Sequence, residues 1–177
     1  THLHVDHVGW NTMLVDGEWI PTFPNARYLI AEQEWTYWDA NENEDLYGPV
    51  ISDSVRPVVD AGMVDFVDDH FSLCTEVSLS PTPGHTPGHV SVLINSKKKR
   101  ALITGDFIHH PVQMTNTDWC SPADYDKKQA QHTRESLLEK YVNQDILVIG
   151  THFSSPTAGH IKFLEGGGYW LDIKNVK

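Results

Sequence analysis

The stretch His2-Leu3-His4-Val5-Asp6-His7-Val8 places three imidazoles and one carboxylate within six positions near the start of the chain. None of these four side chains can be buried in a dry core without a partner. In an extended segment, one side would carry His2, His4 and Asp6, and a turn would then bring His7 beside Asp6. Nitrogen and oxygen donors arranged in this way suit zinc or a similar divalent metal. The interleaved Leu and Val residues and the carboxylate argue against a solvated, tag-like histidine run.

The composition is typical of a folded globular protein. The chain has 177 residues, of which 40% are hydrophobic, and we expect one domain over residues 1–177. The formal net charge of −11 argues against binding to nucleic acid or to a membrane surface, because both need a basic face. Neither Cys74 nor Cys120 belongs to a CxxC pair, which excludes a cysteine-rich zinc finger. No apolar run reaches the length of a membrane span. The location is not fixed by the sequence; a cytoplasmic one is favoured, and secretion stays open.

Apolar periodicity and turn residues predict helices that fall between groups of strands. We expect helices at 31–39, 46–61 and 126–142, the last with Ala130, Leu137, Leu138 and Tyr141 at helical spacing. Strands are predicted at 26–30, 64–67, 74–79, 89–94, 101–104 and 146–149, and a final hairpin at 159–164 and 169–173. Residues 9–24 are typical of a loop, and 121–124 of a helix start. This pattern indicates sheets covered by helices, an α/β or α+β layer structure.

Four further stretches carry residue types that bind metals or transfer protons. The proline- and glycine-rich run 81–89, PTPGHTPGH, predicts a rigid loop that holds His85 and His89 in fixed positions. Asp106 and His152 each follow an apolar strand, where a side chain can point into a cleft, and the pair 109–110 is His-His. Singly, Asp106 could cap a helix and His152 could be a surface imidazole. Their combination with the opening motif favours a shared site.

The motifs in this order resemble those of the metallo-β-lactamase superfamily, over residues 1 to about 160. H-x-H-x-D-H comes first, then TPGHTPGH, then an Asp and a His that each follow a strand. Residues 9–12, 21–26 and 151–153 look like the lactonase and methyl parathion hydrolase-like branch. The resemblance implies an αββα sandwich with metals at one edge of its paired sheets. Members normally have strands before the first motif, so we expect an N-terminally truncated version of this fold.

Carried over motif by motif, the resemblance implies two divalent metal ions. The implied ligands are His2, His4 and His85 for one ion, Asp6, His7 and His152 for the other, and Asp106 as the bridge. His89 would support the loop of His85 instead of binding metal. Zinc is the first choice, and manganese, iron or cobalt suit the same ligands.

These expectations predict a hydrolase that acts on a small molecule. Two such metals would provide hydroxide at neutral pH for attack on a lactone, ester, thioester or phosphotriester. Asp6 or Asp106 would take up the hydroxide proton, and His109 would assist the leaving oxygen. An exposed loop imidazole is the alternative for His109.

Two alternatives to an active hydrolase stay open. The chain could be a metal-binding module without turnover. It could instead be an incomplete fragment that needs a missing segment or a partner chain. An open sheet edge would also allow a homo-oligomer to form.

Overall fold

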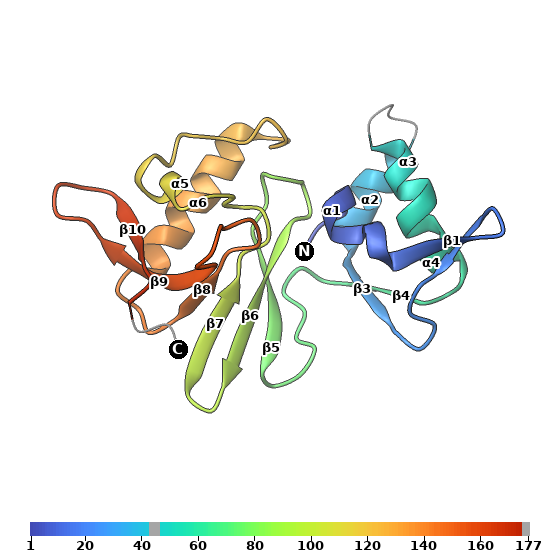
Figure 1. Cartoon of the computed structure of the whole chain (residues 1–177), viewed down its shortest axis with the longest axis horizontal. Coiled ribbons are helices and arrows are strands. Elements are labelled where there is room, and N and C mark those ends of the chain that lie inside the picture. The colour runs from blue at the N-terminus through green and yellow to red at the C-terminus, as the bar shows by residue number, and fades with distance from the viewer. Residues whose placement is uncertain (43–46, 175–177) are drawn as a thin grey trace. The chain divides into compact units, whose positions relative to one another are not determined.

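The structure, a computed structural model, describes residues 1–42 and 47–174. The chain forms two compact units, Thr1–Asp69 and His70–Lys177 (Figure 1). Each unit combines helices with strands, which confirms the predicted α/β class. The single hydrolase domain expected over residues 1–177 stays a prediction. None of the helices in the described ranges is long and apolar enough to cross a membrane.

The histidine motif at the start of the first unit is extended only as far as His4. Helix α1 (Val5–Val8) follows, and then the 3-10 turn η1 (Gly9–Asn11). The carbonyl of His4 accepts hydrogen bonds from the backbone N–H groups of His7 and Val8, at 3.0 and 3.2 Å. The extended arrangement considered for His2, His4 and Asp6 therefore does not form beyond His4, because these bonds wind the chain into a helical turn.

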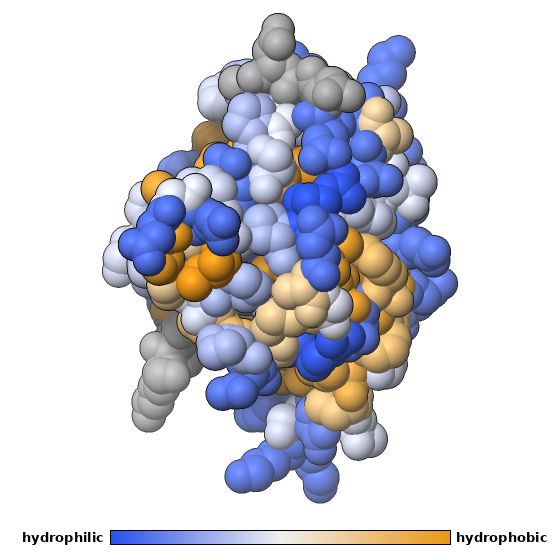
Figure 2. Space-filling model, turned by 90° about the vertical axis from the view of Figure 1, so that its right-hand side faces the viewer, coloured by the Kyte–Doolittle hydropathy of each residue, from blue (hydrophilic) through white to orange (hydrophobic). Residues whose placement is uncertain are grey.

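A short antiparallel hairpin occupies much of the stretch 9–24 that the sequence predicted to be a loop. Strand β1 (Thr12–Val15) pairs with β2 (Glu18–Pro21), and the turn residues Asp16 and Gly17 have φ of 51° and 88°. Positive φ at both positions matches the twist of the flanking strands. Most side chains of this hairpin are exposed, including Leu14 and Trp19. Figure 2 shows one face of the molecule, where apolar surface alternates with hydrophilic side chains.

The rest of the first unit is a parallel strand pair joined through helices. Strand β3 (Tyr28–Ala31) pairs with β4 (Val64–Val67), and between them lie α2 (Glu32–Ala40), α3 (Gly48–Val50), the π-helical turn η2 (Ile51–Val55) and α4 (Arg56–Asp60). The predicted helix 46–61 corresponds to the last three, and its first residue, Leu46, lies outside the described residues. The core residues are Leu3, Val8, Ile30, Trp38, Ile51 and Val55.

A sheet of six strands forms the second unit, in the order β10-β9-β8-β7-β6-β5. The strands are β5 (Val77–Pro81), β6 (Val90–Ser96), β7 (Lys99–Ile103), β8 (Leu147–Ile149), β9 (Ala158–Phe163) and β10 (Tyr169–Asp172). Only β7 and β8 run parallel among these pairs. The strands and final hairpin predicted here are confirmed, with bounds shifted by up to a few residues. The carboxyl ends of β7 and β8 consequently share one edge, where β6 begins.

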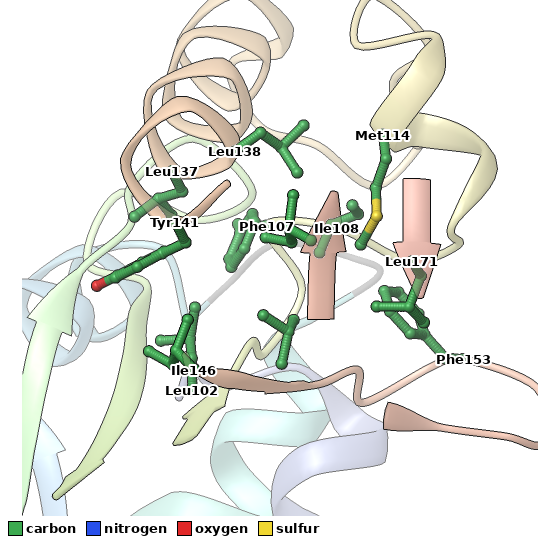
Figure 3. Close-up of a cluster of buried hydrophobic side chains, with 12 residues drawn as sticks. Leu102, Phe107, Ile108, Met114, Leu137, Leu138, Tyr141, Ile146, Phe153 and Leu171 are labelled. Carbon is green, nitrogen blue, oxygen red and sulfur yellow. The ribbon is translucent and has the colours of Figure 1, made fainter. Parts of the chain in front are cut away.

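Helix α6 (Lys127–Tyr141) covers this sheet, and the short helix α5 (Val112–Thr115) precedes it. Asp126 caps α6 by accepting hydrogen bonds from two backbone N–H groups, which confirms the predicted helix 126–142; the start signal at 121–124 lies in the turn before it. The predicted inward face is confirmed, because Ala130, Leu137, Leu138 and Tyr141 are buried. In Figure 3, the α6 side chains meet those of the strands and of Phe107 and Ile108.

The proline- and glycine-rich loop 81–89 is attached to the start of α6. The hydrogen bonds run from Thr133 Oγ1 to Pro83 O, from Asp126 N to Gly84 O and from Tyr125 N to His85 O, at 2.6, 2.9 and 3.1 Å. Gly84 has φ of +128° and lies against the backbone of Ala130. The loop is therefore held through the carbonyl groups of Pro83, Gly84 and His85 itself.

We expect Gly84→Ala to destabilise the second unit. An added Cβ would lie 2.3 Å from the backbone nitrogen of Ala130, so the loop and the helix would have to separate. Strain and overpacking together should cost about 3 kcal/mol of unfolding free energy, measured by chemical denaturation. Gly167→Ala is the matched control, since Gly167 has φ of +108° but no described atom within 4 Å of its added Cβ. Equal losses in the two variants would contradict the close approach.

Candidate metal centre

The opening motif gathers its four polar side chains within the first unit. The ring of His2 is centred 4.7 Å from that of His4 and 4.1 Å from that of His7. The Oδ2 atom of Asp6 lies 3.6 Å from His7 Nε2. The helical turn α1 thus brings Asp6 and His7 to the extended pair, although by a different backbone path from the one expected.

A buried carboxylate, Glu34 of α2, anchors this motif. Its Oε1 accepts hydrogen bonds from the backbone N–H of Leu3 at 3.0 Å and from Trp38 Nε1 at 2.8 Å. The Leu3 side chain belongs to the core, and the ring of His4 stacks on that of Tyr47 at 4.9 Å. The motif is therefore fixed by the packing of its own unit. The sequence analysis missed Glu34, which resembles any other acidic residue on a helix.

One carboxylate oxygen of the second unit has three imidazole nitrogens around it. Asp106 Oδ2 lies 3.0 Å from Nε2 of His152, 3.4 Å from that of His109 and 3.5 Å from that of His85. The Asp106 side chain is 4% exposed. The next residue, Phe107, is part of the core and holds the segment in place (Figure 3). Three loops at one edge of the sheet, following β5, β7 and β8, supply these side chains.

His109 lies inside this cluster. Its ring stacks on that of His152 at 5.4 Å and meets that of His85 edge-on at 4.9 Å. Its side chain is 24% exposed, so it is not the exposed loop imidazole considered as an alternative. His110 is exposed instead, and its Nδ1 accepts a hydrogen bond from the backbone N–H of Val112.

His89 supports Asp106 through a buried chain of hydrogen bonds. Its Nε2 accepts from the backbone N–H of Asp106 at 2.8 Å, so its Nδ1 carries the proton and donates to Thr82 Oγ1 at 2.7 Å. Thr82 then donates to Ser91 Oγ, and Ser91 donates to the carbonyl of Thr104. His89 thus orders the loop, as expected, and also the backbone of Asp106.

The structure adds a second acidic residue that the sequence analysis missed. Asp124 Oδ1 lies 2.8 Å from His85 Nδ1, and both side chains are buried. Ligand atoms of His85, His109 and Asp124 lie within 4.8 Å of one another. Imidazole nitrogens and carboxylate oxygens are the donor set that zinc and similar divalent ions take, so the residues gathered in each unit fit such ions.

The chain belongs to the metallo-β-lactamase superfamily, whose family model matches residues 1–152. Its relatives include the N-acyl homoserine lactonase AttM of Azorhizobium caulinodans, 30% identical over 111 residues, and the probable metallo-hydrolase YflN of Bacillus subtilis, 25% identical over 121 residues. These matches cover 58% and 61% of this chain, and 37% and 42% of the two relatives. The chain therefore spans less than half the length of either relative.

Solved structures confirm the fold of this superfamily. The hydrolase AbOPH matches with a TM-score of 0.83 and 24% identity, over 99% of this chain and 63% of that one. AidC, a dizinc quorum-quenching lactonase, matches with a TM-score of 0.74 and 21% identity, over 89% of this chain and 58% of that one.

Replacing Glu34 by Ala should loosen the histidine motif. The N–H groups of Leu3 and Trp38 would lose a charged acceptor in a buried place, which should cost about 3 kcal/mol of unfolding free energy. Hydrogen exchange at the Leu3 amide should accelerate. Glu32→Ala, at an exposed position of the same helix, is the control. Unchanged exchange at Leu3 in the Glu34 variant would contradict the anchoring role.

Replacing His89 by Leu should destabilise the second unit. The Asp106 N–H and the Thr82 hydroxyl would each lose a partner in a buried site, which should cost about 2–4 kcal/mol of unfolding free energy. His132→Leu, at an exposed position of α6, should have little effect. Denaturant unfolding measures both variants, and similar curves for the two would refute the structural role of His89.

Proposed function

We propose that this chain is a metal-dependent hydrolase that binds two divalent ions, with zinc as the preferred metal. The proposed ligands are His2, His4, Asp6, His7, His85, Asp106 and His152. Membership of the superfamily supports this set, as does the gathering of these side chains within each unit.

The observation that carries the proposal is the environment of Asp106 Oδ2. Three imidazole Nε2 atoms lie 3.0–3.5 Å from this one oxygen. Burying the carboxylate of Asp106 and the ring of His85 has a desolvation cost, which a divalent cation bound among these groups would offset. These groups come from three separate loops. A hydrogen bond with a purely structural role would need only two groups, so the convergence of four favours a binding site.

Metal ions bound here would supply a hydroxide nucleophile at neutral pH. Asp106 or Asp6 would accept the proton released as the nucleophile attacks. His109 is placed to assist the leaving oxygen, because its ring lies in the cluster and is partly open to solvent.

Lactones are the first substrate class to test. Relatives that are 26–30% identical carry the name N-acyl homoserine lactonase. Esters, thioesters and phosphotriesters present similar electrophilic carbonyl or phosphoryl centres and complete the panel.

The test combines elemental analysis of the purified protein with hydrolysis of this panel. We expect bound divalent metal and turnover of at least one substrate. The Asp106→Asn variant should be at least about 100-fold less active, because loss of a metal ligand should lower activity more than the roughly 10–100-fold that follows loss of a residue holding a ligand. Asp145→Asn is the control, since Asp145 is exposed and pairs only at the surface with Lys99. Bound metal without any turnover would favour a metal-binding module, and absence of metal would refute the metal centre.

A further inference from the structure

Asp124 precedes helix α6, and its carboxylate is buried against His85. Its Oδ1 lies 2.8 Å from His85 Nδ1, and the two side chains are 0% and 1% exposed. Its Oδ2 accepts a hydrogen bond from the backbone N–H of Ser121 at 2.8 Å. A carboxylate accepts hydrogen bonds and does not donate them, so the proton in this contact lies on His85 Nδ1.

The position of this proton decides what the other ring nitrogen of His85 can do. In the neutral ring, Nε2 then presents its lone pair. This nitrogen faces Asp106, whose Oδ2 is 3.5 Å away, which is longer than an ordinary hydrogen bond. His85 thus turns Nδ1 toward Asp124 and Nε2 toward the proposed metal ligands.

Arg134 of α6 connects Asp124 with the segment that carries Asp106. Its side chain is completely buried, and its Nη2 lies 3.8 Å from Asp124 Oδ2. Its Nε donates to the carbonyl of Phe107 at 3.1 Å, and its Nη1 donates to that of Thr117. The planar guanidinium holds these acceptors in fixed directions. Because Phe107 follows Asp106, one cation links the partner of His85 to the backbone beside Asp106.

We propose that Asp124 and Arg134 are positioning residues for the metal ligands His85 and Asp106. Asp124 holds the ring of His85 and its Nδ1–H tautomer, and Arg134 balances the charge of Asp124 and ties it to Phe107. This inference rests on the proposed function, because it takes His85 Nε2 as a ligand. Loss of such a partner of a ligating histidine weakens metal binding by about 10–100-fold.

The dissociation constant for Co²⁺, measured by competition with a chromophoric chelator, tests this role. In Asp124→Asn, the amide can pair with either tautomer of His85, so we expect the constant to rise about 10–100-fold. Arg134→Lys keeps the charge but loses the planar fork, and should shift the constant in the same direction by a smaller factor. Asp126→Ala is the matched control, because this nearby carboxylate only caps α6 and its loss should lower stability without changing Co²⁺ affinity.

Nitrogen NMR of the metal-free wild-type protein gives a second readout that requires no variant to fold. We expect the Nδ1–H tautomer for His85, and an Nε2–H tautomer would overturn the inference. Unchanged Co²⁺ affinity in a folded Asp124→Asn variant would overturn it alone and leave the proposed function standing. A wild-type protein that binds no Co²⁺ would overturn the proposed function and this inference with it.

Discussion

The buried carboxylate of Asp106 is the group on which the candidate centre of the second unit depends. A charge in this position is costly without partners, and three imidazole nitrogens lie within 3.5 Å of its Oδ2. Its backbone is held independently of its side chain, because His89 accepts its N–H and Phe107 packs into the core. These two contacts fix the backbone of Asp106, so its carboxylate stays directed toward the three imidazole rings.

Much of the second unit was predictable because its strands are apolar runs separated by turn residues. The first unit was harder, as the β1–β2 hairpin shows. Only Thr12 of β1 is buried, so the alternation that marks a half-buried strand is missing. The Asp16-Gly17 pair was the remaining signal, since both residues take the positive φ that a two-residue turn needs. For α6, both residues 121–124 and Asp126 could mark the N-terminus of the helix. The structure shows that Asp126 does, because its side chain accepts hydrogen bonds from two backbone N–H groups of the first turn.

The residues proposed as metal ligands stand out in the sequence, whereas the residues that hold them in place do not. Histidines and aspartates in short motifs stand out because few other roles require them together. Glu34, Asp124 and Arg134 are ordinary residues for a helix or for the turn before one. Helical periodicity places Arg134 on the same face as Ala130 and Leu137. A charged residue on such a face is nevertheless expected to reach solvent, because arginine is rarely fully buried. Only the tertiary contacts show that all three point inward.

Both units use the same physical device beside their motifs. Glu34 holds the backbone between His2 and His4, and Asp124 holds the ring of His85. An apolar side chain would pack at either position without the desolvation cost of a carboxylate. What the carboxylate adds is direction, because it accepts hydrogen bonds from particular N–H groups. The conformational freedom of the imidazoles is then lost when the chain folds and not when a ligand binds, which strengthens binding at the site. The orientation of the groups they hold therefore explains why acids, and not apolar side chains, occupy these two positions.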